Sequence, residues 1–202
     1  LSRRERKKDE TRERIFKAAI KLFHARGFDA TTVDDITEKA DVAKGTFFNY
    51  FPRKESVLAY LSLKRLEENE ANASEIHAAT RPAREKLIEI YCHAASAYEE
   101  DRELSRYVVN ELMSRAFSPS EEAGYGQRWQ KLLLPVIEQA RASGEFRQDV
   151  PAARIESVLT GVYYALVYCW VNCLELELDL RGEMRAQMTL VFDGIAARGG
   201  AR

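Results

Sequence analysis

The segment 44–51 combines hydrogen-bond donors with large aromatic side chains. It reads Lys44-Gly45-Thr46-Phe47-Phe48-Asn49-Tyr50-Phe51. In a helix, Phe47 and Phe51 lie one turn apart and can bury together against neighbouring helices. The other six residues then face outward, and two exposed aromatic rings, Phe48 and Tyr50, call for a binding partner.

Duplex DNA offers groups that match these outward residues. A hydroxyl of Thr46 or Tyr50 can donate to a phosphate, and Asn49 can meet a base or a phosphate. Phe48 can contact a thymine methyl group, and Gly45 permits a close approach of the backbone. We therefore predict that this segment binds double-stranded DNA.

Two further helical patterns position the segment. Apolar residues between Arg12 and Arg26 follow helical spacing, and Gly27 then supplies a C-terminal cap. Thr32 and Asp35 form a capping-box-like start for a second helix that ends near Ala40. A three-residue connection leads to the helix at 44–51, which Pro52 stops. The result is a helix-turn-helix, whose second helix can lie in the major groove.

Charge is segregated along the chain. Residues 1–55 contain 14 basic and 10 acidic side chains, and the remainder contains 17 basic and 22 acidic ones. The positive segment is therefore the one with the helix-turn-helix. The extension from Ser2 to Arg14 has seven basic and four acidic residues. It is interpreted either as a basic arm on DNA or as a frayed, solvated terminus.

The run from Phe28 to Glu55, FDATTVDDITEKADVAKGTFFNYFPRKE, resembles the signature of the tetracycline-repressor (TetR) family. The resemblance covers roughly residues 10 to 60. Phe48 stands where Tyr is more usual, which removes one hydroxyl. The resemblance implies that eight residues contact DNA: Thr32, Lys44, Gly45, Thr46, Phe48, Asn49, Tyr50 and Lys54.

The rest of the chain predicts further helices and no convincing strand, so the fold is expected to be all-α. The expected spans are 55–79, 81–100, 102–117, 121–143, 152–174 and 181–198. Residues 1–54 are predicted to be the three-helix DNA-binding domain. Residues 55–202 are predicted to be a helical effector-binding and dimerisation domain, as the resemblance implies.

Aromatic residues are concentrated in the second half. Seven of the nine tyrosines and both tryptophans lie between Tyr91 and Trp170. They suit a pocket for a small molecule, although aromatics also fill ordinary cores. By analogy with the family, the predicted pocket residues are Tyr91, Tyr98, Tyr107, Asn110, Met113, Trp129, Tyr163 and Trp170.

The last two helices carry more apolar surface than one core face needs. Gly161, Ala165 and Cys169 form a stripe of small residues that would let a helix of a second copy approach closely. A homodimer through these helices would present two recognition helices roughly 34 Å apart, and would prefer a near-palindromic site. A contact within one chain is the alternative.

Other functions find little support in the sequence. His24, His77 and His93 are the only histidines, and no HExxH, GxSxG or glycine-rich phosphate loop occurs. We therefore expect no enzymatic activity, no cofactor and no metal site. Cys92, Cys169 and Cys173 are interpreted as buried structural thiols, with metal binding or oxidation sensing as the alternative. The odd number of cysteines without the spacing of a disulfide framework, and with no signal peptide before them, predicts a cytoplasmic protein. The uncharged stretch 158–174 is shorter than the roughly 20 residues that span a bilayer and is interpreted as a buried helix.

The resemblance also implies a mechanism. A small hydrophobic or aromatic molecule would shift the long helix that begins near Glu55, change the separation of two recognition helices and release a repressor from its operator. An activator, or a DNA-binding protein that responds to no ligand, would use the same helix-turn-helix. DNA affinity that no ligand changes would indicate the latter.

Overall fold

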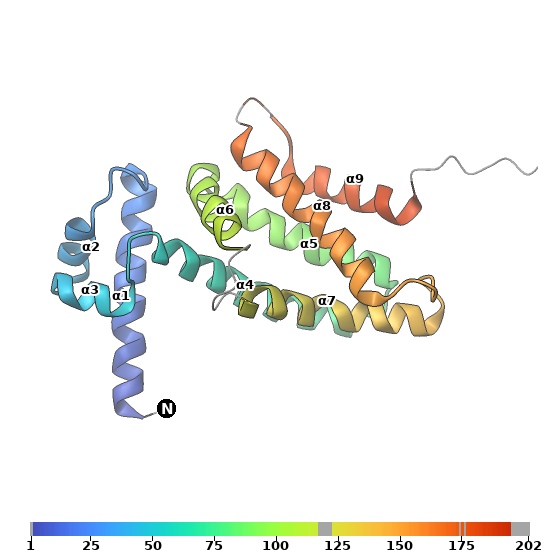
Figure 1. The fold of residues 1–202 in the computed structure, drawn as a ribbon, viewed down its shortest axis with the longest axis horizontal. Helices are drawn as coiled ribbons and strands as arrows, with labels where there is room; N and C mark the ends of the chain where they lie inside the picture. The colour runs from blue at the N-terminus through green and yellow to red at the C-terminus, as the bar shows by residue number, and fades with distance from the viewer. Residues whose placement is uncertain (1, 117–122, 174, 176, 195–202) are drawn as a thin grey trace, which may run out of the picture. The chain divides into compact units, whose positions relative to one another are not determined.

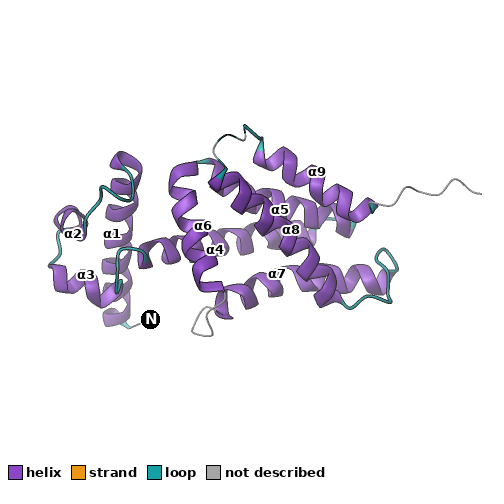
Figure 2. Cartoon of the chain, turned by 45° about the horizontal axis from the view of Figure 1, so that its top comes forward, coloured by secondary structure: helices purple, strands orange, loops and turns teal. Residues whose placement is uncertain are grey.

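A computed structural model describes residues 2–116, 123–173, 175 and 177–194. These residues form nine helices and no strand, which confirms the predicted all-α fold (Figure 2). None of these helices combines the length and the apolar character needed to cross a membrane. The chain divides into two compact units, residues 1–63 with 101–116 and residues 64–100 with 117–202. The predicted functional division at residues 54 and 55 stays a prediction, since these units describe packing alone.

The first unit begins with α1, Arg3–Arg26, which starts nine residues before the helix expected from the sequence. Ser2 caps it: the Ser2 hydroxyl accepts from the backbone N–H of Glu5, and the Glu5 carboxylate accepts from that of Ser2. This capping box stabilises a first turn that apolar periodicity alone could not reveal. Gly27, with φ of 85°, ends the helix in a conformation that favours glycine.

Two short helices pack beside α1: α2, Val33–Ala40, and α3, Lys44–Tyr50 (Figure 1). The unit also contains the start of α4, Ser56–Ala78, and the whole of α6, Arg102–Ala116. Its core joins apolar side chains of all five helices: Ile15, Phe16, Ala19, Phe23, Ile36, Ala40, Phe47, Val57, Leu58, Leu104 and Val108. The recognition segment is thus held by a core to which α6 contributes.

The second unit contains the rest of α4 and four further helices: α5, Ala83–Glu99; α7, Ala123–Ser143; α8, Ala152–Asn172; and α9, Leu180–Asp193. Helix α5 packs against α7, α8 and α9. Residues 117, 121–122, 174 and 195–198, at the ends of expected helices, lie outside the described residues. The Glu145 carboxylate accepts from the backbone N–H groups of Ala83 and Arg84 at 2.9 and 3.0 Å. A side chain from the connection between α7 and α8 thereby caps α5.

Candidate nucleic-acid interface and sensor cluster

Helix α3 is anchored by one face and exposed on the others. Phe47 is fully buried and Phe51, its C-terminal cap, is 2% exposed, as the spacing predicts. The two rings lie 5.8 Å apart, and Phe51 meets Tyr60 of α4 at 5.7 Å. Phe48 is 44% exposed, and Gly45 and Asn49 are also exposed. The anchor therefore fixes which side of α3 remains open to a partner.

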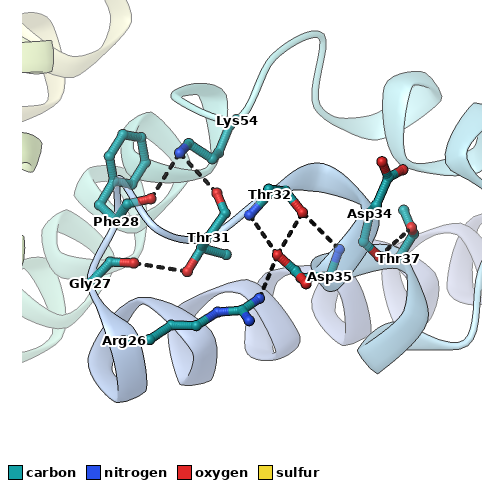
Figure 3. Close-up of polar contacts among 9 residues, drawn as sticks. All are labelled: Arg26, Gly27, Phe28, Thr31, Thr32, Asp34, Asp35, Thr37 and Lys54. Atoms are coloured by element: carbon teal, nitrogen blue, oxygen red, sulfur yellow. Dashed lines mark hydrogen bonds and ion pairs between the residues drawn. The ribbon is translucent and has the colours of Figure 1, made fainter.

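Thr32 begins α2 and is part of a capping box. Its hydroxyl accepts from the backbone N–H of Asp35 at 3.2 Å and donates to an Asp35 carboxylate oxygen at 2.5 Å. Arg26 pairs with the same carboxylate oxygen at 2.5 Å (Figure 3). Hydrogen bonding from Arg26 and then from Thr32 holds the pKa of Asp35 far below its usual value. Thr32 therefore fixes the geometry where the helix-turn-helix begins.

Lys54 precedes α4 and bonds inward. Its ammonium group donates to the backbone oxygens of Phe28 and Thr31 at 2.8 and 2.9 Å, and lies 4.2 Å from the centre of the Phe28 ring (Figure 3). Thr31 is itself buried and donates to the Gly27 carbonyl at 2.8 Å. Lys54 therefore ties the connection between α1 and α2 to the start of α4.

Lys44 is the only cationic residue of α3. Its ammonium group lies 2.8 Å from a carboxylate oxygen of Asp34 in α2, and both side chains are more than half exposed. A surface pair of this kind contributes little stability and can exchange for another anion.

A cleft of about 500 Å³ lies between the N-terminal half of α1 and α3. Four side chains of α1 and three of α3 line it: Arg4, Lys7, Lys8, Thr11, Thr46, Asn49 and Tyr50. The three α3 residues were predicted from the sequence to contact DNA, whereas none of the four α1 residues was. Their spacing at positions 4, 7, 8 and 11, which places them on one helix face, was the available signal.

The eight predicted DNA contacts thus occupy different places. Thr46, Asn49 and Tyr50 line the cleft. Gly45 and Phe48 are exposed on a neighbouring side of α3, and Lys44 lies at the start of that helix. Thr32 and Lys54 lie outside α3 and have intramolecular bonds.

The second unit contains an aromatic cluster formed by Tyr91, Trp129 and Tyr163. The Trp129 and Tyr163 rings stack at 5.5 Å, and Tyr91 lies 5.8 and 5.5 Å from them. All three are buried. Burial raises the pKa of the Tyr163 hydroxyl well above its usual value, and nearby tyrosines, Tyr98 first, raise it further. The sequence-predicted pocket residues Tyr91, Trp129 and Tyr163 therefore come together in space.

Thr160 gives this cluster a polar centre. Its hydroxyl lies 3.0 Å from the Tyr91 hydroxyl, accepts from the Trp129 indole N–H at 3.3 Å, and donates to Glu156 at 2.8 Å. Glu156 is only 3% exposed, and Gln130 approaches its other carboxylate oxygen at 3.4 Å. Sequence reasoning missed Thr160 and Glu156, since a four-residue spacing on a helix is too common to signal a buried network.

Tyr98 lies beside Tyr163 and so adjoins this cluster, whereas the other four predicted pocket residues lie elsewhere. Tyr107, Asn110 and Met113 belong to α6, in the first unit. The Tyr107 hydroxyl donates to Asp29 at 2.5 Å, and its ring lies 4.8 Å from that of Phe28. Tyr98 is buried beside the guanidinium group of Arg65, and the Trp170 indole donates to the Leu178 carbonyl at 2.9 Å.

Helix α8 has an exposed face that is poor in charge. Val158 and Tyr168 are 51% and 46% exposed, and Gly161, Ala165 and Cys169 are exposed on the same face. Leu190 of α9 is 52% exposed. Cys92 is buried, as predicted, but the prediction was wrong for Cys169 and Cys173, which are exposed in the single chain. Both lie at the C-terminal end of α8, on a side that the core does not cover.

A helix-turn-helix whose second helix is anchored on one face and exposed on the others is typical of DNA-binding proteins. Residues 15–61 match the family described as bacterial regulatory proteins, tetR family. The chain therefore contains the DNA-binding segment of this family of transcription regulators.

Individual relatives support this assignment over different lengths. The regulator YerO of Bacillus subtilis is 42% identical over 50 residues, which are 25% of this chain and 17% of YerO. The repressor KstR of Mycolicibacterium smegmatis is 26% identical over 165 residues, 81% of this chain and 78% of KstR. Thermus thermophilus FadR, a repressor crystallised with lauroyl-CoA, aligns at 28% identity and a TM-score of 0.78 over 95% of this chain and 98% of FadR.

Proposed function

We propose that the protein is a ligand-responsive repressor that binds double-stranded DNA as a homodimer. One observation carries the DNA-binding part: α3 buries Phe47 and Phe51 while Phe48, Asn49 and Gly45 remain exposed. A helix held this way can enter the major groove without disturbing its own core. Residues 1–54 would hold the DNA, and residues 55–202 would bind the effector and a second copy.

The effector site is proposed in the second unit, around Tyr91, Trp129 and Tyr163. Their rings offer apolar surface, and the Thr160 hydroxyl beside the Glu156 carboxylate offers a polar anchor. A small hydrophobic or aromatic molecule suits such surroundings. Because FadR was crystallised with lauroyl-CoA, an acyl-CoA thioester is the first probe to test.

A second copy is proposed to cover the exposed face of α8 together with Leu190. Exposed Val158 and Tyr168 supply apolar area, and Gly161 and Ala165 permit close approach of a helix. We expect a dimer of the wild-type protein by sedimentation, and a monomer for Ala165→Asp, which places a charge on that face.

The matched control for the dimer is Ala142→Asp, which introduces the same charge at an exposed position of α7. This variant should remain a dimer, because the change lies on another helix. A monomeric wild-type protein would contradict the dimer part of the proposal.

Fluorescence anisotropy on labelled genomic fragments that flank the protein's own gene tests the function as a whole. We expect tight, salt-sensitive binding that lauroyl-CoA or a compound from an aromatic panel releases, whereas free CoA does not. Tight binding that no compound changes favours a DNA-binding protein without an effector, and binding that a compound strengthens favours another mode of regulation, including activation. Absence of binding to any DNA at low salt would refute the proposal.

A further inference from the structure

Helix α3, the predicted recognition helix, has few of the cations that DNA affinity normally requires. Neutralisation of phosphates by Lys and Arg dominates the binding of proteins to duplex DNA. Lys44, the cation of α3, already pairs with Asp34, and Lys54 bonds to two backbone oxygens. The eight predicted contacts include no further cationic residue. Even if Lys44 exchanges Asp34 for a phosphate it supplies one cation, so most of the positive charge close to α3 must come from another element.

The cleft between α1 and α3 provides that charge. Arg4, Lys7 and Lys8 line one wall, and none of the described residues that line the cleft is acidic. The opposite wall bears the hydroxyl groups of Thr46 and Tyr50 and the amide of Asn49. Three cations that face three neutral hydrogen-bonding groups are suited to bind the oxygens of a phosphate group.

Three of the four acidic residues in this part of α1 have partners outside the cleft, and helical periodicity places the fourth, Asp9, away from Arg4, Lys7 and Lys8. Glu5 closes the capping box with Ser2. Glu10 pairs with Arg6 at 3.9 Å, and Glu13 pairs with Lys17 at 3.8 Å. Helical periodicity places Arg6 and Lys17 on the side of α1 opposite to Arg4, Lys7 and Lys8. The mixed charge of the segment is thus sorted by face, with the basic stripe next to α3.

We propose that this cleft binds a backbone phosphate of DNA, held by Arg4, Lys7 and Lys8 of α1 and by polar groups of α3. The proposal rests on the DNA-binding function. It also assigns different DNA contacts to different sides of α3. Thr46, Asn49 and Tyr50 contact the backbone from the cleft side, which leaves Gly45 and Phe48 for the base edges. The first turns of α1 are therefore part of the DNA-binding surface.

The test uses the full-length protein and a labelled random-sequence duplex of about 30 base pairs, because backbone binding needs no particular operator. Two variants remove two charges each from opposite faces of α1. The cleft variant is Lys7→Gln/Lys8→Gln, and the far-face variant is Arg6→Gln/Lys17→Gln. Gln preserves helix propensity, and circular dichroism verifies the helix content.

We expect the salt dependence of binding to differ between the two. The slope of log affinity against log salt concentration should fall by about one per bound protomer for the cleft variant, because a single phosphate contact contributes about one. The dissociation constant near 0.1 M salt should rise by about tenfold or more. The far-face variant should keep nearly the wild-type slope. An equal loss of DNA affinity and salt slope in both variants would overturn the proposal, since only the net charge of α1 and not the cleft would then determine binding.

A further variant tests the cleft without altering charge. Tyr50→Phe removes only a hydroxyl, so we expect a few-fold weaker binding with an unchanged salt slope. If Tyr50 and the basic residues share one phosphate, this loss should shrink in the background of the cleft variant. Strict additivity would refute a shared phosphate. A wild-type protein that binds no duplex at low salt would instead refute the proposed function itself.

Discussion

The two units place their polar side chains differently. In the first unit, Thr32, Asp35 and Lys54 form bonds at the connections between helices, close to the surface. In the second, the buried Glu156 and the partly buried Thr160 form bonds beside aromatic rings. Surface bonds that shape a short connection leave a local sequence signal, whereas an interior network is assembled by packing. The first arrangement suits a rigid DNA-binding surface, and the second suits the proposed effector site.

Among the substitutions that compare the two units, Phe47→Ala should cause the largest loss of stability. It removes a fully buried ring from the core of the first unit, and should lower the free energy of unfolding by about 3–5 kcal/mol. Urea denaturation monitored by circular dichroism measures the loss. Phe48→Ala, at the exposed neighbour, should change stability by no more than about 0.5 kcal/mol. Comparable losses for both would contradict the assignment of the anchored and open faces of α3.

Lys54→Met should come next, with a loss of about 2 kcal/mol in the free energy of unfolding. The substitution leaves two backbone oxygens, those of Phe28 and Thr31, without their charged donor. Urea denaturation again measures the effect, and Lys39→Met on the exposed surface of α2 is the matched control. Unchanged stability together with a reduced salt slope on DNA would assign Lys54 to phosphate binding instead.

Thr160→Val should cost about 1–2 kcal/mol in the second unit. The side chain keeps its shape but loses the hydroxyl that serves Tyr91, Trp129 and Glu156, so that a buried carboxylate oxygen loses a donor. Trp fluorescence during urea unfolding reports the change close to Trp129. Thr80→Val, the same substitution at an exposed position between α4 and α5, should have almost no effect. Equal losses at the two threonines would argue against a buried network.

Asp35→Asn should have the smallest effect, and one that depends on pH. Because folding lowers the Asp35 pKa, the carboxylate stabilises the folded state above the ordinary carboxyl pKa, and this contribution is lost as pH falls below about 4. The variant should therefore be less stable than wild type near neutral pH and approach it in acid. Thermal unfolding between about pH 7 and pH 3, with Asp9→Asn as the control, measures the difference. A gap independent of pH would contradict it.

The sequence predicted the helices of the first unit well because their signals are local. Thr32 and Asp35 mark a helix start within three residues, and Phe47 with Phe51 marks a buried face within one turn. The length of α1 was missed, since residues 3–11 contain no apolar stripe and only the Ser2 cap announces a helix. The basic cleft was missed for a related reason: it requires the position of α3 beside that extension.

The partners of the aromatic residues could not be predicted from the sequence. Tyr98 and Tyr107 are close in sequence, yet Tyr107 bonds to Asp29, 78 residues earlier in the chain. Composition can indicate that aromatics are abundant, but partners of this separation are decided by tertiary packing. Glu156 illustrates the same limit, because nothing in its neighbours along the chain indicates burial.

The membership of α6 in the first unit has a consequence for how this regulator can be recombined with others. The chain leaves that unit after Leu63 and returns at Asp101. A chimera that exchanges only residues 1–63 would leave Leu104 and Val108 behind, along with the Tyr107 bond to Asp29. A chimera that transfers this unit intact must therefore take both segments, residues 1–63 and 101–116, from the same donor.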